Sequence, residues 1–419
     1  MHSRPQRRTR ARGAIIAAAV VVAFAASAAA GYFAFSPHRS PGSAPSRPAA
    51  GSTHPSRATG TSGAASRSAS PAAGPRPAAL PRLSLAQMAG QRVIYSYPGL
   101  TPPAALLRLI SHGEAAGVIF FGPNISSQAQ IAKVIVVLER ANASPLNPVR
   151  APLLLMTDQE GGILRRMPGA PFLSERQIGQ AADPAAQATA AGTGAALNLR
   201  GVGMDVNLAP VLDVYRQPGD FDDQYGRSYS TDPGAVSHLG ADFITAQQRA
   251  GVAATAKHFP GLGAAATAQD TDDVPVTLSQ SPSVIRNTDE LPYKAAIAAG
   301  VRLVMVSWAV YPALAPGRPA GLSSVIIAGE LRQRLGFKGV TITDALEAGA
   351  LRAFGTTENR SLLAAQAGMD LILCSEQNFT EGQQAVAGLE AGYGDGRLGH
   401  AAFSAAVGRV LALRASLRR

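Results

Sequence analysis

Eight short apolar runs, separated by longer stretches of helical character, organise most of this 419-residue chain. They cover residues 92–97, 117–121, 153–157, 203–208, 252–258, 301–308, 339–343 and 370–374. Several are hydrophobic on both faces, as parallel strands covered by helices must be. Eight such units in about 335 residues predict a TIM (β/α)8 barrel with enlarged loops. A doubly wound open sheet is the alternative, but no glycine-rich dinucleotide fingerprint follows the first run, which argues against it.

Three of these runs end in basic side chains or are followed directly by an acidic one. The fifth ends in Lys257 and His258, after which Pro260 and Gly261 turn the chain into a loop. The third and seventh runs are each followed directly by an aspartate. Barrel enzymes place their ligand-binding groups at the carboxyl ends of the strands. We therefore expect these side chains to meet in one site.

The strand ends resemble those of glycoside hydrolase family 3, specifically its single-domain β-N-acetylhexosaminidases. The resemblance covers residues 83–411, and it rests on several motifs that occur in the family's order. The matching segments are 153–162, 209–214, 226–229, 256–263 and 331–347. One such motif is weak evidence, whereas this many in order is specific.

The resemblance implies a retaining glycosidase, which needs an ionised carboxylate as nucleophile and a protonated group as acid. Asp344 occupies the family's nucleophile position, and residues 345–354 are expected to form a helix that begins beside it. Without the resemblance, a helix-capping role would be the favoured interpretation of Asp344. The family's sugar-binding residues correspond to Asp158, Arg227, Lys257 and His258, although His258 is also compatible with a core histidine bonded to a backbone carbonyl.

The general acid is where the chain departs from the family pattern. The corresponding loop of the familiar hexosaminidases carries a histidine, but residues 261–273 contain none. Counting from Lys257 without gaps places Asp270 on that histidine, so Asp270 is the first candidate acid/base and Asp272 the second. A carboxyl can serve if burial raises its pKa. The alternative is a solvated acidic loop in a weak or inactive enzyme.

Two further departures concern the sugar pocket. Ile163 stands where the family usually has an arginine, and Trp308, the single tryptophan, stands where a histidine is common. Trp308 is expected either to stack on a sugar face or to fill the barrel mouth. No cofactor is expected, and no metal site is implied, because the seven histidines show no paired ligand spacing.

The first 82 residues differ in composition from the rest. Eleven of the 38 basic residues lie there without any acidic residue, so the remaining 27 basic residues match the 27 acidic ones. The high pI therefore gives no reason to expect nucleic-acid binding by the body. Residues 1–13 are expected to be a cytoplasmic basic segment, 14–35 a transmembrane anchor or cleavable signal peptide, 36–82 a disordered linker and 83–419 the catalytic barrel.

Together these features predict an exported, cofactor-independent exo-glycosidase that releases terminal β-linked N-acetylglucosamine, with peptidoglycan fragments as its substrate. The membrane is a further expected partner, through the N-terminal segment; if that segment is cleaved, the protein is secreted. The alternatives are another family 3 β-glycosidase, of the β-glucosidase type, and a catalytically weak protein that binds wall glycans. Hydrolysis and phosphorolysis are not distinguished by the sequence.

Overall fold

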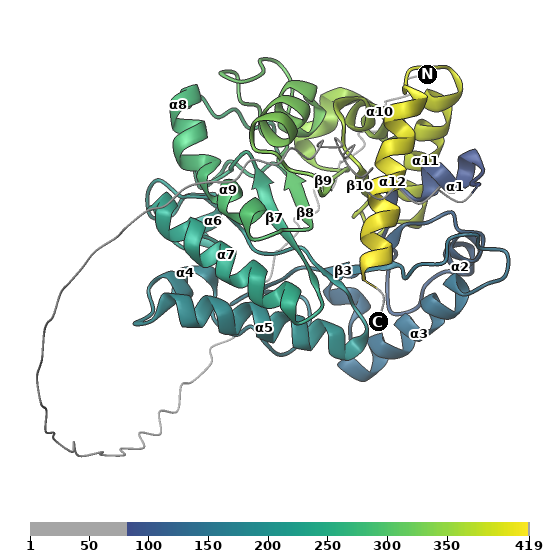
Figure 1. The fold of residues 1–419 in the computed structure, drawn as a ribbon, viewed down its shortest axis with the longest axis horizontal. Coiled ribbons are helices and arrows are strands. Elements are labelled where there is room, and N and C mark those ends of the chain that lie inside the picture. Colours follow the sequence, from purple (N-terminus) through teal and green to yellow (C-terminus); the bar gives the residue numbers. More distant parts are fainter. Residues whose placement is uncertain (1–81, 418–419) are drawn as a thin grey trace, which may run out of the picture. The chain divides into compact units, whose positions relative to one another are not determined.

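The computed structural model describes residues 82–417, which fold around a closed parallel β-barrel (Figure 1). In chain order the barrel strands are β1 (Val93–Tyr95), β2 (Gly117–Ile119), β3 (Leu154–Thr157), β6 (Val206–Asn207), β7 (Ala253–Phe259), β8 (Leu303–Val306), β9 (Val340–Ala345) and β10 (Leu371–Leu373). Each pairs in parallel with its neighbours in chain order, and β1 closes the ring by pairing with both β2 and β10. The predicted eight-stranded TIM-type barrel is confirmed.

Side chains alternate between the inside and the outside of the barrel. On β3, Leu154 and Met156 belong to the interior cluster, whereas Leu155 packs outward against the helices. On β8, Leu303 and Met305 point inward in the same way. A period of two along each strand makes this division automatic. Because both faces are covered, both sets of positions are apolar, which is why the runs read as continuously hydrophobic.

Helices surround the barrel and fill the connections between strands. The α-helices are α1 (Leu85–Gly90), α2 (Ala104–Ser111), α3 (Gln128–Asn142), α4 (Glu175–Gly179), α5 (Pro184–Val202), α6 (Phe221–Gln224), α7 (Pro233–Arg249), α8 (Pro282–Val284), α9 (Leu291–Ala298), α10 (Thr357–Ala367), α11 (Phe379–Gly394) and α12 (His400–Ser416). The 3₁₀ helices are η1 (Gly122–Asn124), η3 (Ala320–Leu322) and η5 (Gly349–Phe354), and the π-helices are η2 (Ile285–Asp289) and η4 (Val325–Arg334). The hairpin of β4 (Gln159–Gly161) and β5 (Leu164–Arg165) follows β3.

The two ends of the barrel differ. Val410 and Leu413, from α12, join the interior cluster together with Ala116, which precedes β2. The last helix therefore closes the amino-terminal end of the barrel with apolar side chains. Its Arg414 is buried and donates to the carbonyls of Pro152 and Ala151, just before β3. The carboxyl ends of the strands are left for the long loops.

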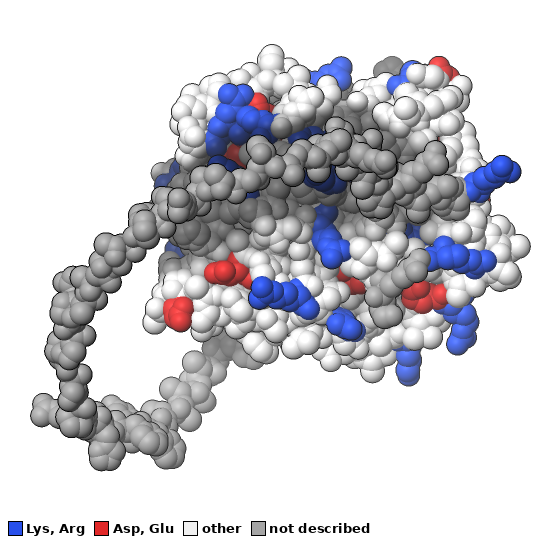
Figure 2. All heavy atoms as spheres, in the orientation of Figure 1, with Lys and Arg blue, Asp and Glu red and all other residues white. Residues whose placement is uncertain are grey.

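Charged side chains of the described residues lie singly or in small groups among uncharged ones on the face drawn in Figure 2. This distribution accords with the balance of basic and acidic residues outside the first 82. Within residues 82–417, no helix has the length and apolar character needed to cross a bilayer. The predicted membrane segment at 14–35 and most of the predicted linker at 36–82 lie outside the described residues.

Candidate active site

A cavity of about 460 Å³ opens at the carboxyl ends of the barrel strands. Its walls come from the ends of the strands and from the loops that follow them. The seven site residues predicted from the sequence all line it: Asp158, Arg227, Lys257, His258, Asp270, Asp272 and Asp344. The structure thus brings together side chains that lie up to nearly 190 positions apart in the sequence, because the carboxyl ends of all strands in a parallel barrel lie at the same end.

Lys257 is buried near the end of β7 and is held by two carboxylates. Its Nζ lies 2.8 Å from Oδ1 of Asp158, directly after β3, and 2.7 Å from Oε1 of Glu160 on β4. Burial opposes the charge of the ammonium, but Asp158 and Glu160 outweigh it, so the pKa of Lys257 is raised. The lysine is therefore a fixed cation in the cavity wall.

Arg227 extends the same ion cluster. Its guanidinium donates to both oxygens of Glu160, at 2.9 and 3.0 Å, and a second edge lies 3.0 Å from Asp222. Although burial disfavours ionised Glu160, Arg227 and Lys257 hold its pKa at about 2. Charges fixed this firmly are pre-organised hydrogen-bonding groups, which is what recognition of vicinal sugar hydroxyls requires.

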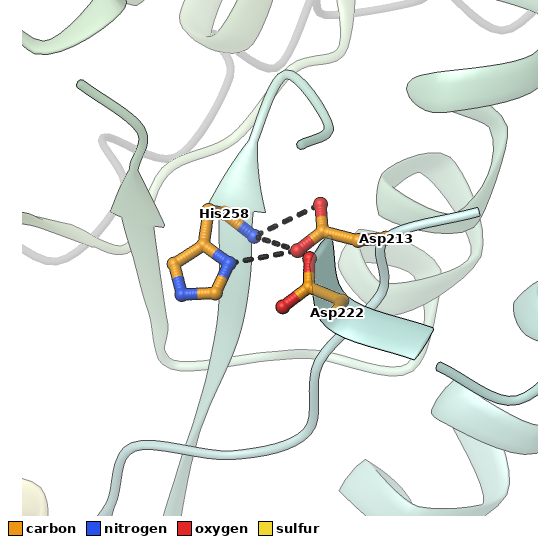
Figure 3. Close-up of side chains that lie close together, drawn as sticks. All are labelled: Asp213, Asp222 and His258. Carbon is orange, nitrogen blue, oxygen red and sulfur yellow. Dashed lines mark hydrogen bonds and ion pairs between the residues drawn. The ribbon is translucent and has the colours of Figure 1, made fainter. Parts of the chain in front are cut away.

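His258 is buried and faces a carboxylate pair (Figure 3). Its Nδ1 lies 2.7 Å from Oδ2 of Asp213, which also accepts hydrogen bonds from the backbone N–H groups of His258 and Leu262. Burial opposes protonation of the imidazole, yet Asp213 raises the pKa of His258. The partner of this histidine is thus a carboxylate rather than the backbone carbonyl considered above, and the ring also lines the cavity.

Asp222 lies beside Asp213 in this group. Burial, opposed by Arg227, raises the pKa of Asp222 to about 7, and the neighbouring charge of Asp213 adds to the shift. Asp213, Asp222 and His258 offer ligand atoms within 4.8 Å of one another, so the set has the composition of a metal site. The Arg227 guanidinium 3.0 Å from Asp222 already supplies a positive charge. The arrangement fits a hydrogen-bonded network that shares protons better than a cation site.

Asp344 lies in β9, one residue before its end, and its carboxylate accepts a hydrogen bond from the N–H of Ala345 at 2.9 Å. The expectation of a helix beginning beside Asp344 is wrong. The strand continues through Ala345, and the next helical turn, η5, begins only at Gly349, with Ala348 preceding it. Asp344 is therefore not a helix cap, and it reaches the cavity from the strand itself.

The acidic loop after β7 is hydrogen-bonded to the segment that follows Asp344. The N–H of Gly349 donates to the carbonyl of Asp272 at 2.6 Å, and that of Ala350 donates to Thr271 at 3.1 Å. A Cβ at position 349 would lie 2.0 Å from the carbonyl oxygen of Asp273, so only glycine permits this approach. The contact places the Asp272 carboxyl in the same cavity as Asp344.

The two candidate acids in this loop differ in their surroundings. Asp270 accepts a hydrogen bond from the N–H of Asp272 at 2.9 Å, which forms a tight turn. Asp272 lines the cavity and remains exposed to solvent, and desolvation by the surrounding protein raises its pKa to about 7, with Asp344, Asp270 and Glu347 adding repulsion. A carboxyl with this pKa is protonated in about half of the molecules at pH 7. These observations favour Asp272 over Asp270 as a proton donor.

Trp308 and Ile163, the two departures from the family pattern near the sugar pocket, have different surroundings. Trp308 is fully buried, and its indole N–H donates to the carbonyl of Ala345 at 2.7 Å, so it does not stack on a sugar. Of the two roles open to it, filling the barrel mouth is the one observed. Ile163 is 73% exposed at the turn of the β4–β5 hairpin, outside the cavity wall, whereas Arg166 of the same hairpin region lines the cavity.

Sequence reasoning missed several residues that line or support the cavity: Glu160, Arg166, Asp213, Asp222 and Glu347. Three of them carried a signal: Glu160 follows Asp158 by two positions, Asp213 lies in the matched segment 209–214 and Glu347 ends the matched segment 331–347. Asp222 gave none, because it is one of two adjacent aspartates on the four-residue helix α6.

A closed parallel barrel whose strand ends gather carboxylates and fixed cations in one cavity is an arrangement that barrel glycosidases use. The chain matches the family model described as the glycosyl hydrolase family 3 N terminal domain over residues 83–413. It therefore belongs to glycosyl hydrolase family 3.

Relatives of this chain include proteins described as hydrolases. An uncharacterized secreted glycosyl hydrolase from Arthroderma benhamiae is 45% identical over 336 residues, covering 80% of this chain and 94% of that protein. A β-hexosaminidase of Xanthomonas campestris pv. campestris is 34% identical over 291 residues, covering 67% and 83%.

Solved structures of this family superpose well on the barrel. The family 3 β-N-acetylglucosaminidase from Paenibacillus sp. str. FPU-7 has a TM-score of 0.75 at 34% identity over 80% of this chain, and the match spans 63% of that longer protein. The β-N-acetylhexosaminidase of Beutenbergia cavernae has a TM-score of 0.70 at 29% identity, covering 80% of this chain and 99% of that one.

Proposed function

We propose that this family 3 hydrolase removes terminal β-linked N-acetylglucosamine by a two-step retaining mechanism without a cofactor. The observation that carries the proposal is the coexistence, in one cavity, of Asp344 and of Asp272, whose pKa is raised to about 7, beside the cluster of Asp158, Arg227 and Lys257. The preference for N-acetylglucosamine is supported by relatives named β-hexosaminidase and β-N-acetylglucosaminidase.

In the first step the sugar's hydroxyls bind the Lys257 and Arg227 cluster, whose charges need no rearrangement to receive them. Asp344 attacks the anomeric carbon while Asp272 gives its proton to the departing oxygen. In the second step Asp272, now ionised, takes a proton from water as that water displaces Asp344 from the sugar.

His258 is assigned to sugar binding, oriented by Asp213. Because Nδ1 faces Asp213, the other ring nitrogen is the one available to the substrate. Asp270 is assigned to the turn that presents Asp272, since its carboxylate accepts the Asp272 N–H. The first candidate from the sequence thus becomes a positioning residue, and the second becomes the acid/base.

Export is proposed for the mature domain. It is supported by the arginine-rich apolar leader and by a relative described as secreted. Residues 83–419 form the proposed catalytic domain, 36–82 a linker and 14–35 an anchor or signal peptide. Peptidoglycan fragments are the proposed natural substrate, because an exported enzyme with this specificity meets N-acetylglucosamine in the cell wall.

The first test is Asp344→Asn, which is nearly isosteric but cannot form the glycosyl-enzyme. We expect turnover of 4-nitrophenyl β-N-acetylglucosaminide to be lost while binding of N-acetylglucosamine is kept. Asp273→Asn, an exposed neighbour outside the cavity wall, is the matched control. Retention of more than about a tenth of the wild-type rate would remove Asp344 from this role.

Specificity and stereochemistry are tested on the wild type. A panel of nitrophenyl β-glycosides should show preference for N-acetylglucosamine over glucose and xylose, and preference for glucose would favour the β-glucosidase alternative. Proton NMR of the first sugar released should show the β-anomer. Adding phosphate distinguishes hydrolysis from phosphorolysis by the product formed.

A further inference from the structure

We propose that Trp308 is a positioning residue that sets the orientation of the Asp344 carboxylate through the backbone of Ala345. The inference rests on the proposed role of Asp344 and adds a residue that the mechanism above does not use. It assigns a function to the single tryptophan of the chain.

Two hydrogen bonds connect the side chains of Trp308 and Asp344 through Ala345. The indole Nε1 of Trp308 donates to the carbonyl oxygen of Ala345 at 2.7 Å. The N–H of the same residue, Ala345, donates to Oδ1 of Asp344 at 2.9 Å. Ala345 therefore connects the two side chains, because its carbonyl accepts the indole N–H and its own N–H donates to the carboxylate. The Ala345 carbonyl also accepts the N–H of Ala348 at 3.2 Å, so the turn after β9 is fixed at the same atom.

The indole itself cannot shift easily. Trp308 is completely buried, two positions beyond the end of β8. A Cβ at Gly321 would lie 2.4 Å from its Cζ3, so η3 packs directly on the ring. The backbone on either side of the tryptophan is tied to this turn, because Gly321 donates to the carbonyl of Ser307 and Ala320 to that of Ala309. A side chain fixed by packing makes a precise anchor.

Trp308 lies outside the cavity, so its role is to position Asp344 and not to bind the sugar. Trp308 is not among the described residues that line the cavity, and its polar atom is directed at β9. It therefore acts on the substrate only through Asp344. A nucleophile misplaced by a fraction of an ångström loses much of its rate while the sugar still binds.

The chain permits a single-atom test, because incorporation of a tryptophan analogue alters only position 308. Replacing tryptophan with β-(benzo[b]thienyl)alanine exchanges the indole N–H for sulfur and keeps the ring's shape. We expect kcat/KM for 4-nitrophenyl β-N-acetylglucosaminide to fall by about tenfold or more, with the inhibition constant for N-acetylglucosamine changed by less than about twofold. Trp308→Phe should act in the same direction.

Phe243→Leu is the control, since it alters a fully buried aromatic residue on α7, far along the chain from both Trp308 and Asp344. It should lower the melting temperature and leave kcat/KM unchanged. An analogue-containing enzyme with wild-type kcat/KM overturns the inference. A raised inhibition constant for N-acetylglucosamine with an unchanged kcat also overturns it, because that result indicates that Trp308 contacts the sugar. If the wild type itself shows no turnover, the proposed function fails and this inference fails with it.

Discussion

Removing the carboxyl of Asp272 is the sharpest test of the acid/base assignment. General acid catalysis by a positioned side chain typically contributes about 10²- to 10⁴-fold, and the contribution grows as the leaving group becomes more basic. For Asp272→Ala we therefore expect a loss of that size on an N-acetylglucosamine disaccharide. A dinitrophenyl glycoside needs little protonation and should still form the glycosyl-enzyme rapidly.

The pH dependence follows from the pKa of about 7 for Asp272. The acid must carry a proton in the first step, so the active form is the one present below this pKa. About 90% of the enzyme is in that form at pH 6 and about 10% at pH 8. We expect kcat/KM on the disaccharide to fall about tenfold per pH unit above 7, and the fall to vanish in Asp272→Ala.

The assay is a series of aryl glycosides with leaving groups of rising pKa, measured with and without azide. Azide should restore the second step in Asp272→Ala, because it attacks without a general base. Asp273→Ala, an exposed carboxylate in the same loop, controls for a general loss of negative charge. If Asp270→Ala shows the steep leaving-group dependence and azide rescue while Asp272→Ala does not, the reasoning from the raised pKa of Asp272 and from the turn geometry is refuted.

Three further predictions concern the supporting residues and the leader. Asp270→Asn keeps an oxygen to accept the Asp272 N–H but removes a charge that raises the Asp272 pKa, so the alkaline limb of kcat/KM should move to lower pH; an unmoved limb contradicts this. Glu160→Gln leaves Lys257 and Arg227 without their shared partner and should lower the free energy of unfolding by about 3–5 kcal/mol in denaturant titrations, whereas Asp158→Asn, at a more exposed carboxylate, should cost less. Deleting residues 1–82 should leave a folded, active enzyme, and a well-expressed but inactive product would show that the leader contributes to the site.

The barrel could be predicted because its signal is local and repeated. Because the strands are buried on both faces, runs such as 153–157 and 301–308 are mostly apolar, and the strand count follows from counting such runs. The grouping of Asp158, Lys257 and Asp344 in one cavity follows in turn, because parallel strands bring their carboxyl ends to one edge.

The rest depends on contacts between loops, which leave no periodic pattern. The choice between Asp270 and Asp272 turns on a two-residue turn and on docking against Gly349, and counting positions from Lys257 cannot detect either. The helix predicted after Asp344 was wrong for a related reason. Alanine and leucine in 345–354 favour helix, but hydrogen bonds from Trp308 and to Leu373 keep the chain extended before it turns.

Gly349 has a consequence for how function is lost in this family. Because it has no side chain, the loop of Asp272 can lie against the segment that follows Asp344 and accept the Gly349 N–H. A homologue with alanine at this position would retain every carboxylate, cation and motif by which an active enzyme is recognised. Its counterparts of Asp272 and Asp344, the proposed reacting groups, would nevertheless stand further apart, because the added methyl carbon forces the loop outward. Inspection of functional groups alone would classify such a protein as a hydrolase, and only the space between the loops would reveal that it is not one.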